Sequence, residues 1–118
     1  MASTKSASTL LTSQSLAAAT AVNATELNLS TAYRSRVFVK LTNSGTPPST
    51  APTVVFYSGE STGAKRTLYT ATGDTTANSV NHLNCEYGLA DMFANVTITN
   101  GATNAITVEV FAETATGI

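Results

Sequence analysis

The sequence predicts an all-β protein, either an antiparallel β-sandwich or a jelly-roll-like barrel of seven to eight short strands. Two observations predict this class. Short segments alternate apolar and polar residues with a period of two, as in "SRVFVKLTN" (35–43) and "ITVEV" (106–110). Segments rich in Gly, Pro, Asn and Asp separate them at regular intervals. At 118 residues, the chain has the length of one domain.

The expected strands follow one another with short connections. In chain order they are 8–11, an extended edge segment over 15–22, 25–29, 35–43, 53–58, 64–72, 79–84, and a closing hairpin over 95–114 whose first strand reaches back to residue 93. In the strand 79–84, we expect Val80 and either His82 or Leu83 to point inward.

The expected loops are marked by residues that interrupt strands. Segment 43–52 contains three prolines and is expected to be a loop. Segment 85–91 is expected to be a connection. In the turn "NGATNA" (100–105), we expect Gly101 and Asn104 to take left-handed backbone conformations.

Residues 1–14 are poor in core-forming side chains, which divides the chain into an N-terminal arm (1–14) and a sandwich domain (15–118). We expect the arm to pack on a neighbouring subunit rather than on its own sandwich.

Three phenylalanines lie opposite the aliphatic side of their own strands. They are Phe38, Phe93 and Phe111. Either a second internal layer covers them, for example the N-terminal segment, or they form an interface with another chain. The neighbouring charges, including Arg36 and Lys40, favour an interface, because a closed core rarely admits unpaired charges. If 95–114 is one hairpin, Phe93 and Phe111 lie close together.

Charged residues make up only 11% of the chain, about half the usual share for a globular domain. A protein packed against neighbours needs little surface charge, although a Thr-rich β surface explains the same composition. The net charge of −1 gives no electrostatic footprint for nucleic acid. No apolar run reaches the ~20 residues of a membrane helix, so we expect neither nucleic acid nor a membrane as partner.

We expect no catalytic, metal or cofactor site. His82 and Cys85 are metal-ligand types beside Glu86, but each is the only residue of its kind in the chain, and a zinc site needs three or four ligands. "GESTGAKRT" (59–67) differs from a phosphate-binding loop in spacing and is followed by a strand.

Three segments together resemble the small β-sandwich structural proteins of tailed bacteriophages. They are "STLLTSQSLAAATAVNATELNLSTAY" (8–33), "VFVKLTNSGTPPSTAPTVVFYSG" (37–59) and "NVTITNGATNAITVEVFAETATGI" (95–118). The segment "HLNCEYGLADMF" (82–93) departs from the family pattern.

The resemblance implies a non-enzymatic virion protein without cofactors. Within the virion, we expect a capsid decoration (cement) protein that binds the outer head surface as a trimer or dimer, with the major capsid protein or other virion proteins as partners. The alternatives are a subunit of the tail or head–tail connector, or a carbohydrate-binding module with Tyr57, Tyr69 or Tyr87 as stacking platform.

Overall fold

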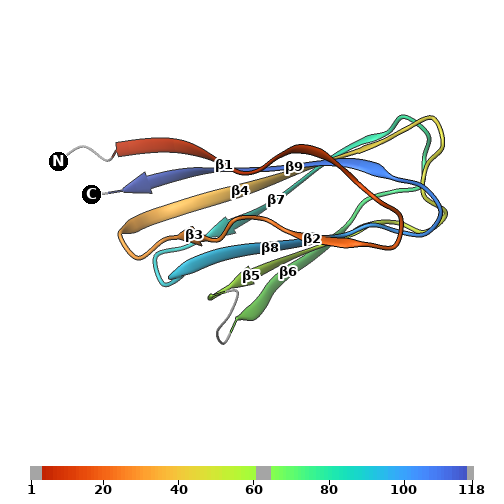
Figure 1. Ribbon diagram of the computed structural model, residues 1–118. Helices are drawn as coiled ribbons and strands as arrows, with labels where there is room; N and C mark the ends of the chain where they lie inside the picture. The colour runs from red at the N-terminus through yellow and green to blue at the C-terminus, as the bar shows by residue number, and fades with distance from the viewer. Residues whose placement is uncertain (1–3, 61–64, 117–118) are drawn as a thin grey trace.

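The computed structural model describes residues 4–60 and 65–116, which form two antiparallel sheets packed face to face (Figure 1). The strands are β1 (Thr4–Leu16), β2 (Ala21–Asn23), β3 (Leu27–Asn28), β4 (Ala32–Asn43), β5 (Thr53–Ser58), β6 (Arg66–Thr72), β7 (Val80–Tyr87), β8 (Phe93–Thr99) and β9 (Ile106–Thr116). Sheet A has the order β1-β9-β4-β7, and sheet B has the order β2-β8-β5-β6 with β3 also paired to β8. The predicted sandwich is confirmed, with nine strands among the described residues.

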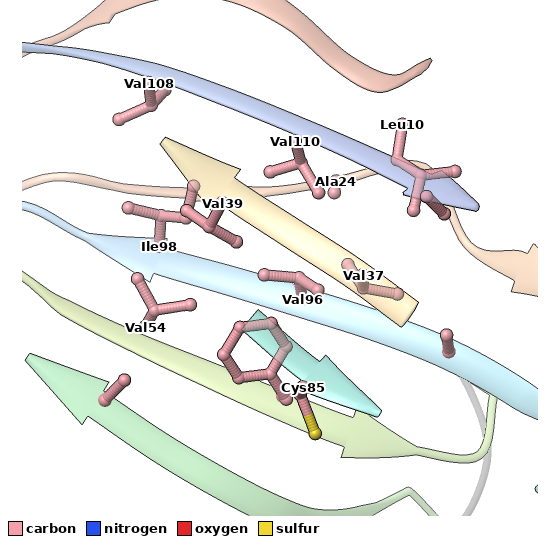
Figure 2. Close-up of a cluster of buried hydrophobic side chains, with 14 of the residues drawn as sticks. Leu10, Ala24, Val37, Val39, Val54, Cys85, Val96, Ile98, Val108 and Val110 are labelled. Atoms are coloured by element: carbon pink, nitrogen blue, oxygen red, sulfur yellow. The ribbon is translucent and has the colours of Figure 1, made fainter. Parts of the chain in front are cut away.

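The core lies between the two sheets and is built from the alternating residues that the sequence pattern singled out. Val37, Val39 and Leu41 of β4 are buried. Aliphatic side chains of β9 and β8 meet them (Figure 2). Phe56 of β5 belongs to the same buried cluster. Because successive strand residues point to opposite faces, each of these strands also presents a second row of side chains on the outside.

Strand β1 differs from the predicted N-terminal arm. Residues 4–16 pair with β9 of the same chain along nearly its whole length, so a boundary at residue 14 falls inside a strand of sheet A. Only Leu10 and Leu16 of this edge strand are buried, and two register irregularities follow Thr9 and Leu11. An edge strand needs few core residues, because its hydrogen bonds to β9 hold it in place. Packing on a neighbouring subunit stays a prediction.

The predicted hairpin over 95–114 is wrong. Its two strands form as expected, but β8 lies in sheet B and β9 in sheet A. The segment between them therefore crosses from one sheet to the other. Asn100 is buried there and donates from its side-chain amide to the carbonyl oxygens of Leu16 and Asn104.

The backbone of this crossing also differs from the expectation. The left-handed conformation is at Thr103, with a φ of 85°, and neither Gly101 nor Asn104 has a positive φ. Gly101 instead permits close packing, because a Cβ atom on it would collide with the carbonyl oxygen of Thr50.

Strand β7 extends through Tyr87, so the expected connection 85–91 begins as strand. Cys85 and Tyr87 are buried, and Leu83 shares their side of the strand. Val80 lies on the opposite side and is 46% exposed, which corrects the expectation that it points inward. Within residues 4–60 and 65–116 we find no helical segment with the length and hydropathy needed to cross a membrane.

Candidate functional site: the outer face of sheet A

Two of the three predicted interface phenylalanines form a stacked pair on the outer face of sheet A. Phe38 of β4 and Phe111 of β9 are directly opposite each other in the strand register. Their ring centroids are 5.0 Å apart and the ring planes differ by 15°. Phe111 is 36% exposed, while Phe38 is half-buried. The pair forms an apolar centre on a face that no other element of the described chain covers, as the layer arrangement shows (Figure 1).

The charges around this pair are segregated by strand. The charged residues of β4 are all basic, namely Arg34, Arg36 and Lys40, and those of β9 are both acidic, namely Glu109 and Glu113. Register pairing puts them side by side in rows, with Arg36 opposite Glu113 and Lys40 opposite Glu109. The Phe38–Phe111 row lies between these two charged rows. We call six of these residues, Arg36, Phe38 and Lys40 of β4 and Glu109, Phe111 and Glu113 of β9, the Phe face.

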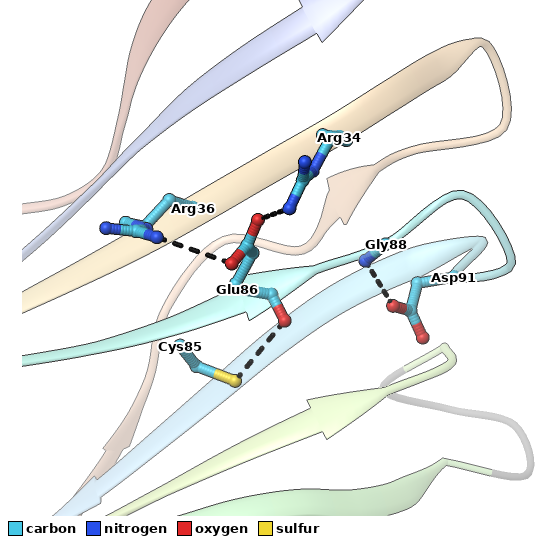
Figure 3. Close-up of polar contacts among 6 residues, drawn as sticks. All are labelled: Arg34, Arg36, Cys85, Glu86, Gly88 and Asp91. Carbon is cyan, nitrogen blue, oxygen red and sulfur yellow. Dashed lines mark hydrogen bonds and ion pairs between the residues drawn. The ribbon is translucent and has the colours of Figure 1, made fainter.

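One carboxylate on β7 attracts the two arginines of β4. Arg34 and Arg36 both direct a guanidinium Nη2 atom at Glu86, and the Arg36 contact is 3.3 Å (Figure 3). The side chains of all three residues are 42–59% exposed. Such exposed ion pairs contribute little to folding stability. They do orient Arg36 toward β7 and away from Glu113.

The other charges of the Phe face form no ion pairs within the part of the chain that the structure describes. Lys40, Glu109 and Glu113 make no salt bridge there, even though cross-strand partners of opposite charge are adjacent. A depression of about 320 Å³ lies beside the rings, lined by Phe38, Val39, Lys40, His82, Leu83, Asn84, Glu109 and Phe111. An exposed aromatic centre with a polar rim is typical of a surface that binds another macromolecule.

Phe93 does not belong to this surface. It lies on β8 in sheet B, and its register partner is Asn28 of β3. Its side chain is half-buried on the far side of the sandwich from Phe38 and Phe111. The structure therefore brings together four of the five predicted interface residues and separates Phe93, because the strands that carry Phe93 and Phe111 belong to different sheets.

His82 and Cys85 point away from each other. His82 is exposed on the outer side of β7, near the Phe face, whereas Cys85 is buried on the inner side. Burial raises the pKa of the Cys85 thiol above its ordinary value. A protonated thiol among core side chains is a poor nucleophile and a poor metal ligand. Residues 4–60 and 65–116 contain no group of three or more His, Cys, Asp or Glu side chains placed to hold a metal ion.

A second exposed apolar group lies at one end of the sandwich and was missed from the sequence. Leu89 is 69% exposed and Met92 is 54% exposed, both around the turn between β7 and β8. Tyr33, 36% exposed, lies at the start of the neighbouring strand β4. We call these three residues the apolar tip. The atypical segment 82–93 contains two of them, and two apolar residues within a short polar turn were the available signal.

Asp91 fixes the shape of the apolar tip. One carboxylate oxygen accepts a hydrogen bond of 2.7 Å from the backbone N–H of Gly88, and the other accepts one of 2.7 Å from the Ser58 hydroxyl (Figure 3 shows the Gly88 contact). The first bond closes the turn and the second ties it to β5. Leu89, inside this turn, is therefore held in an exposed position by hydrogen bonds on either side.

No protein-family model and no curated protein matches this chain. Among solved structures, its fold is similar to that of the SPBc2 prophage-derived protein YomS, with a TM-score of 0.55 and 16% sequence identity. The likeness covers 98% of this chain and 96% of YomS. At this identity, it shows a shared all-β fold along nearly the full length of both proteins.

Proposed function

We propose that this chain is a non-enzymatic structural protein of a phage virion, and that it is a capsid decoration (cement) protein on the outer surface of the head. The observation that carries the proposal is that the Phe face and the apolar tip both expose apolar side chains and lie apart from each other on the molecule. A single-ligand binding protein needs one such surface. A subunit inside an assembly needs one for each kind of neighbour.

The two surfaces are separated by a charged row. Tyr33 and Phe38 are about 16 Å apart along the extended strand β4, and Arg34 and Arg36 project from this stretch toward Glu86. The apolar tip is at the end of the sandwich at which β1 begins and β9 ends (Figure 1). We propose that this end meets the major capsid protein, and that the Phe face meets a different neighbour.

The shared fold with a prophage-derived protein supports a phage origin. The low charge content of 11% also fits a protein whose surface is largely covered by neighbours. A tail or connector subunit would share both properties, so location on the particle decides between these roles.

The test is electron microscopy of particles produced by the phage or prophage that encodes this chain, with a label fused to the C-terminus. Label density spread over the head surface, and lost from particles of a deletion strain, is the expected result. Label confined to the tail or the connector would overturn the decoration role. Particles that lack the chain altogether would overturn the virion role.

A second measurement addresses the apolar tip. Replacing Leu89 and Met92 by Ser should reduce occupancy on heads while leaving the fold intact, because both side chains are more than half exposed. Leu68→Ser is the matched control, since Leu68 is 44% exposed on edge strand β6, and it should leave occupancy unchanged. Equal loss in both variants would show that the tip has no special role.

A further inference from the structure

We propose that the Phe face binds a second copy of this chain, as a two-fold dimer whose axis runs along the strands between β4 and β9. The inference deepens the proposed function, since it names the neighbour of one of the two exposed surfaces. It is carried by the strand-wise segregation of charge on the Phe face.

A two-fold axis parallel to the strands, placed between β4 and β9, lays β9 of each copy over β4 of the other. Residues at the same height along the strands then face each other across the interface. Glu113 faces Arg36 of the second copy, and Glu109 faces Lys40 of the second copy. Between these charged rows, Phe111 faces Phe38 of the second copy. Every charge on the Phe face meets an opposite charge, and the four rings form one apolar centre.

The other simple arrangement is unfavourable. An axis that runs across the strands would lay β4 over β4 and β9 over β9. Arg36 would then face Lys40 of the second copy, and Glu109 would face Glu113 of the second copy. Like charges directly opposite each other repel, so this arrangement is selected against. Face-to-face sheets normally pack with their strands about 30° apart, so in the proposed dimer the axis lies within about 15° of the strands.

The lack of ion pairs at Lys40, Glu109 and Glu113 also favours a second copy of this chain as the partner. These three residues make no salt bridge in the described part of one chain, and the proposed dimer supplies a partner for each. Arg36 keeps one contact to Glu86 and gains Glu113 of the second copy. At the edges of the interface, the same register places Asn84 of β7 in one copy over Thr9 of β1 in the other, so two polar side chains face each other there.

The size of the face predicts a weak dimer. Four strands about 4.8 Å apart and about ten residues long cover about 19 by 33 Å, or about 600 Å² per copy. Specific interfaces typically bury about 800 Å² per partner. With only one aromatic pair per copy at its centre, the dimer is expected to dissociate in the micromolar range.

The test is sedimentation velocity of the full chain at low salt, from about 1 to about 500 µM. The wild type should convert from monomer to dimer within this range. Glu109→Lys and Lys40→Glu should each weaken the dimer about tenfold or more, because each places like charges face to face at two symmetric positions.

An equimolar mixture of the two variants should restore the dimer. In the mixed dimer, the lysine introduced at position 109 of one variant faces the glutamate introduced at position 40 of the other, and the native pair of charges faces across the second symmetric position. Arg66→Glu, on sheet B, is the control and should leave the dimer unchanged.

Three outcomes would overturn the dimer: a wild type that stays monomeric throughout, a dimer insensitive to both charge reversals, or a mixture that fails to restore association. Circular dichroism verifies that each variant is folded. If either variant is not folded, Glu113→Lys and Arg36→Glu, in the other charged row, replace them with the same expected results. The test is independent of the proposed function. A chain found on heads but monomeric in solution overturns only the dimer, and a dimer absent from particles overturns only the virion role.

Discussion

The outer faces of the two sheets are built differently although their inner faces are alike. Of six basic and seven acidic residues in the chain, four basic and three acidic ones lie on the strands of sheet A. Among the described strands of sheet B, the only charged residue is Arg66. Threonines take the place of charges there, at positions 53, 67, 70, 72, 97 and 99.

This difference in composition bears on the proposed contact face. Threonine favours strands and its hydroxyl is readily satisfied by water or by a neighbour, as in the 2.6 Å bond from Thr97 to Asn23. The strands of sheet B are therefore rich in hydroxyl groups and nearly free of charge. Sheet A instead carries an exposed aromatic pair and charges that form no ion pair within the described residues. Both features contribute little to the stability of the isolated sandwich, which favours a role in association.

The largest expected loss of folding stability comes from truncating an aromatic ring on the inner face of a sheet. Phe56 of β5 is fully buried. Phe56→Ala should destabilise the folded chain by about 3–5 kcal/mol, the range for large core truncations. Urea unfolding followed by circular dichroism measures this free energy. A loss below about 1 kcal/mol would show that the inner face of sheet B is not packed as a core.

A smaller loss of folding stability is expected from removing a hydroxyl group that forms a hydrogen bond between the two sheets. The phenol of Tyr87, fully buried on β7 of sheet A, donates a 2.9 Å hydrogen bond to the carbonyl oxygen of Tyr57 on β5 of sheet B. Burial raises the pKa of Tyr87 well above its ordinary value. Tyr87→Phe leaves that carbonyl without this donor, and should lower the unfolding free energy by about 1–2 kcal/mol.

The matched control is Tyr33→Phe, at a side chain that is 36% exposed. It should change stability by less than about 0.5 kcal/mol, as is usual for surface positions. Equal effects of the two substitutions in thermal melts would mean that the bond between the sheets contributes nothing.

Local pattern predicted the strands well but not which strands share a sheet. Alternation in 93–99 and 106–110 identified both β8 and β9 and their inner residues. A short segment between two strands can either turn back within one sheet or cross to the other. Tertiary contacts decide between the two, here the buried Asn100 and the close packing of Gly101 on Thr50. These contacts join residues far apart in the sequence and leave no local signal.

The candidate site was predicted in part for the same reason. Phe38, Phe111, Arg36 and Lys40 were placed on outer faces, because each residue's side of its strand follows from alternation alone. The pairing of β4 with β9, which segregates the charges, is non-local and could not be read from the pattern. The apolar tip lies mostly in a turn, where no periodicity indicates which side chains are exposed.

The stability contributed by the connection between β6 and β7, which joins the two sheets, should depend on pH. Asp74, between β6 and β7, accepts hydrogen bonds from the Ser79 hydroxyl, the Thr76 backbone N–H and the Asn43 amide. These bonds, that of Ser79 first, hold the pKa of Asp74 below its ordinary value. A lowered folded-state pKa contributes stability above the unfolded-state pKa of about 3.9, and this contribution is lost as pH falls through the folded-state value.

Asp74→Asn should therefore lower the melting temperature at pH 7, and the difference from the wild type should shrink progressively below about pH 4. Differential scanning calorimetry across this pH range measures it. A difference that is constant with pH would show that the Asp74 charge has no part in holding the connection.

The smallest effect on folding, and the sharpest test of the two faces, is expected from Phe111→Ala. The ring is 36% exposed and its main contact is the 5.0 Å stack on Phe38. Losing a stacked pair at the surface should lower the unfolding free energy by about 1 kcal/mol. Association should suffer much more, because the ring lies at the centre of the proposed interface, where truncation has its largest effects.

Phe93→Ala is the matched control, since Phe93 is a half-buried phenylalanine on the outer face of sheet B. It should reduce stability by a comparable amount or more and leave the sedimentation of the dimer unchanged. If Phe111→Ala destabilised the monomer by the roughly 3–5 kcal/mol of a core truncation without affecting association, the ring would act within its own chain, and the difference between the two outer faces would concern folding alone. If both variants weakened association equally, neither face could be assigned as the contact surface. We expect only the sheet A variant, Phe111→Ala, to weaken the dimer. The reason is that, among the described residues, Lys40, Glu109 and Glu113, which form no ion pair, surround Phe111 on sheet A.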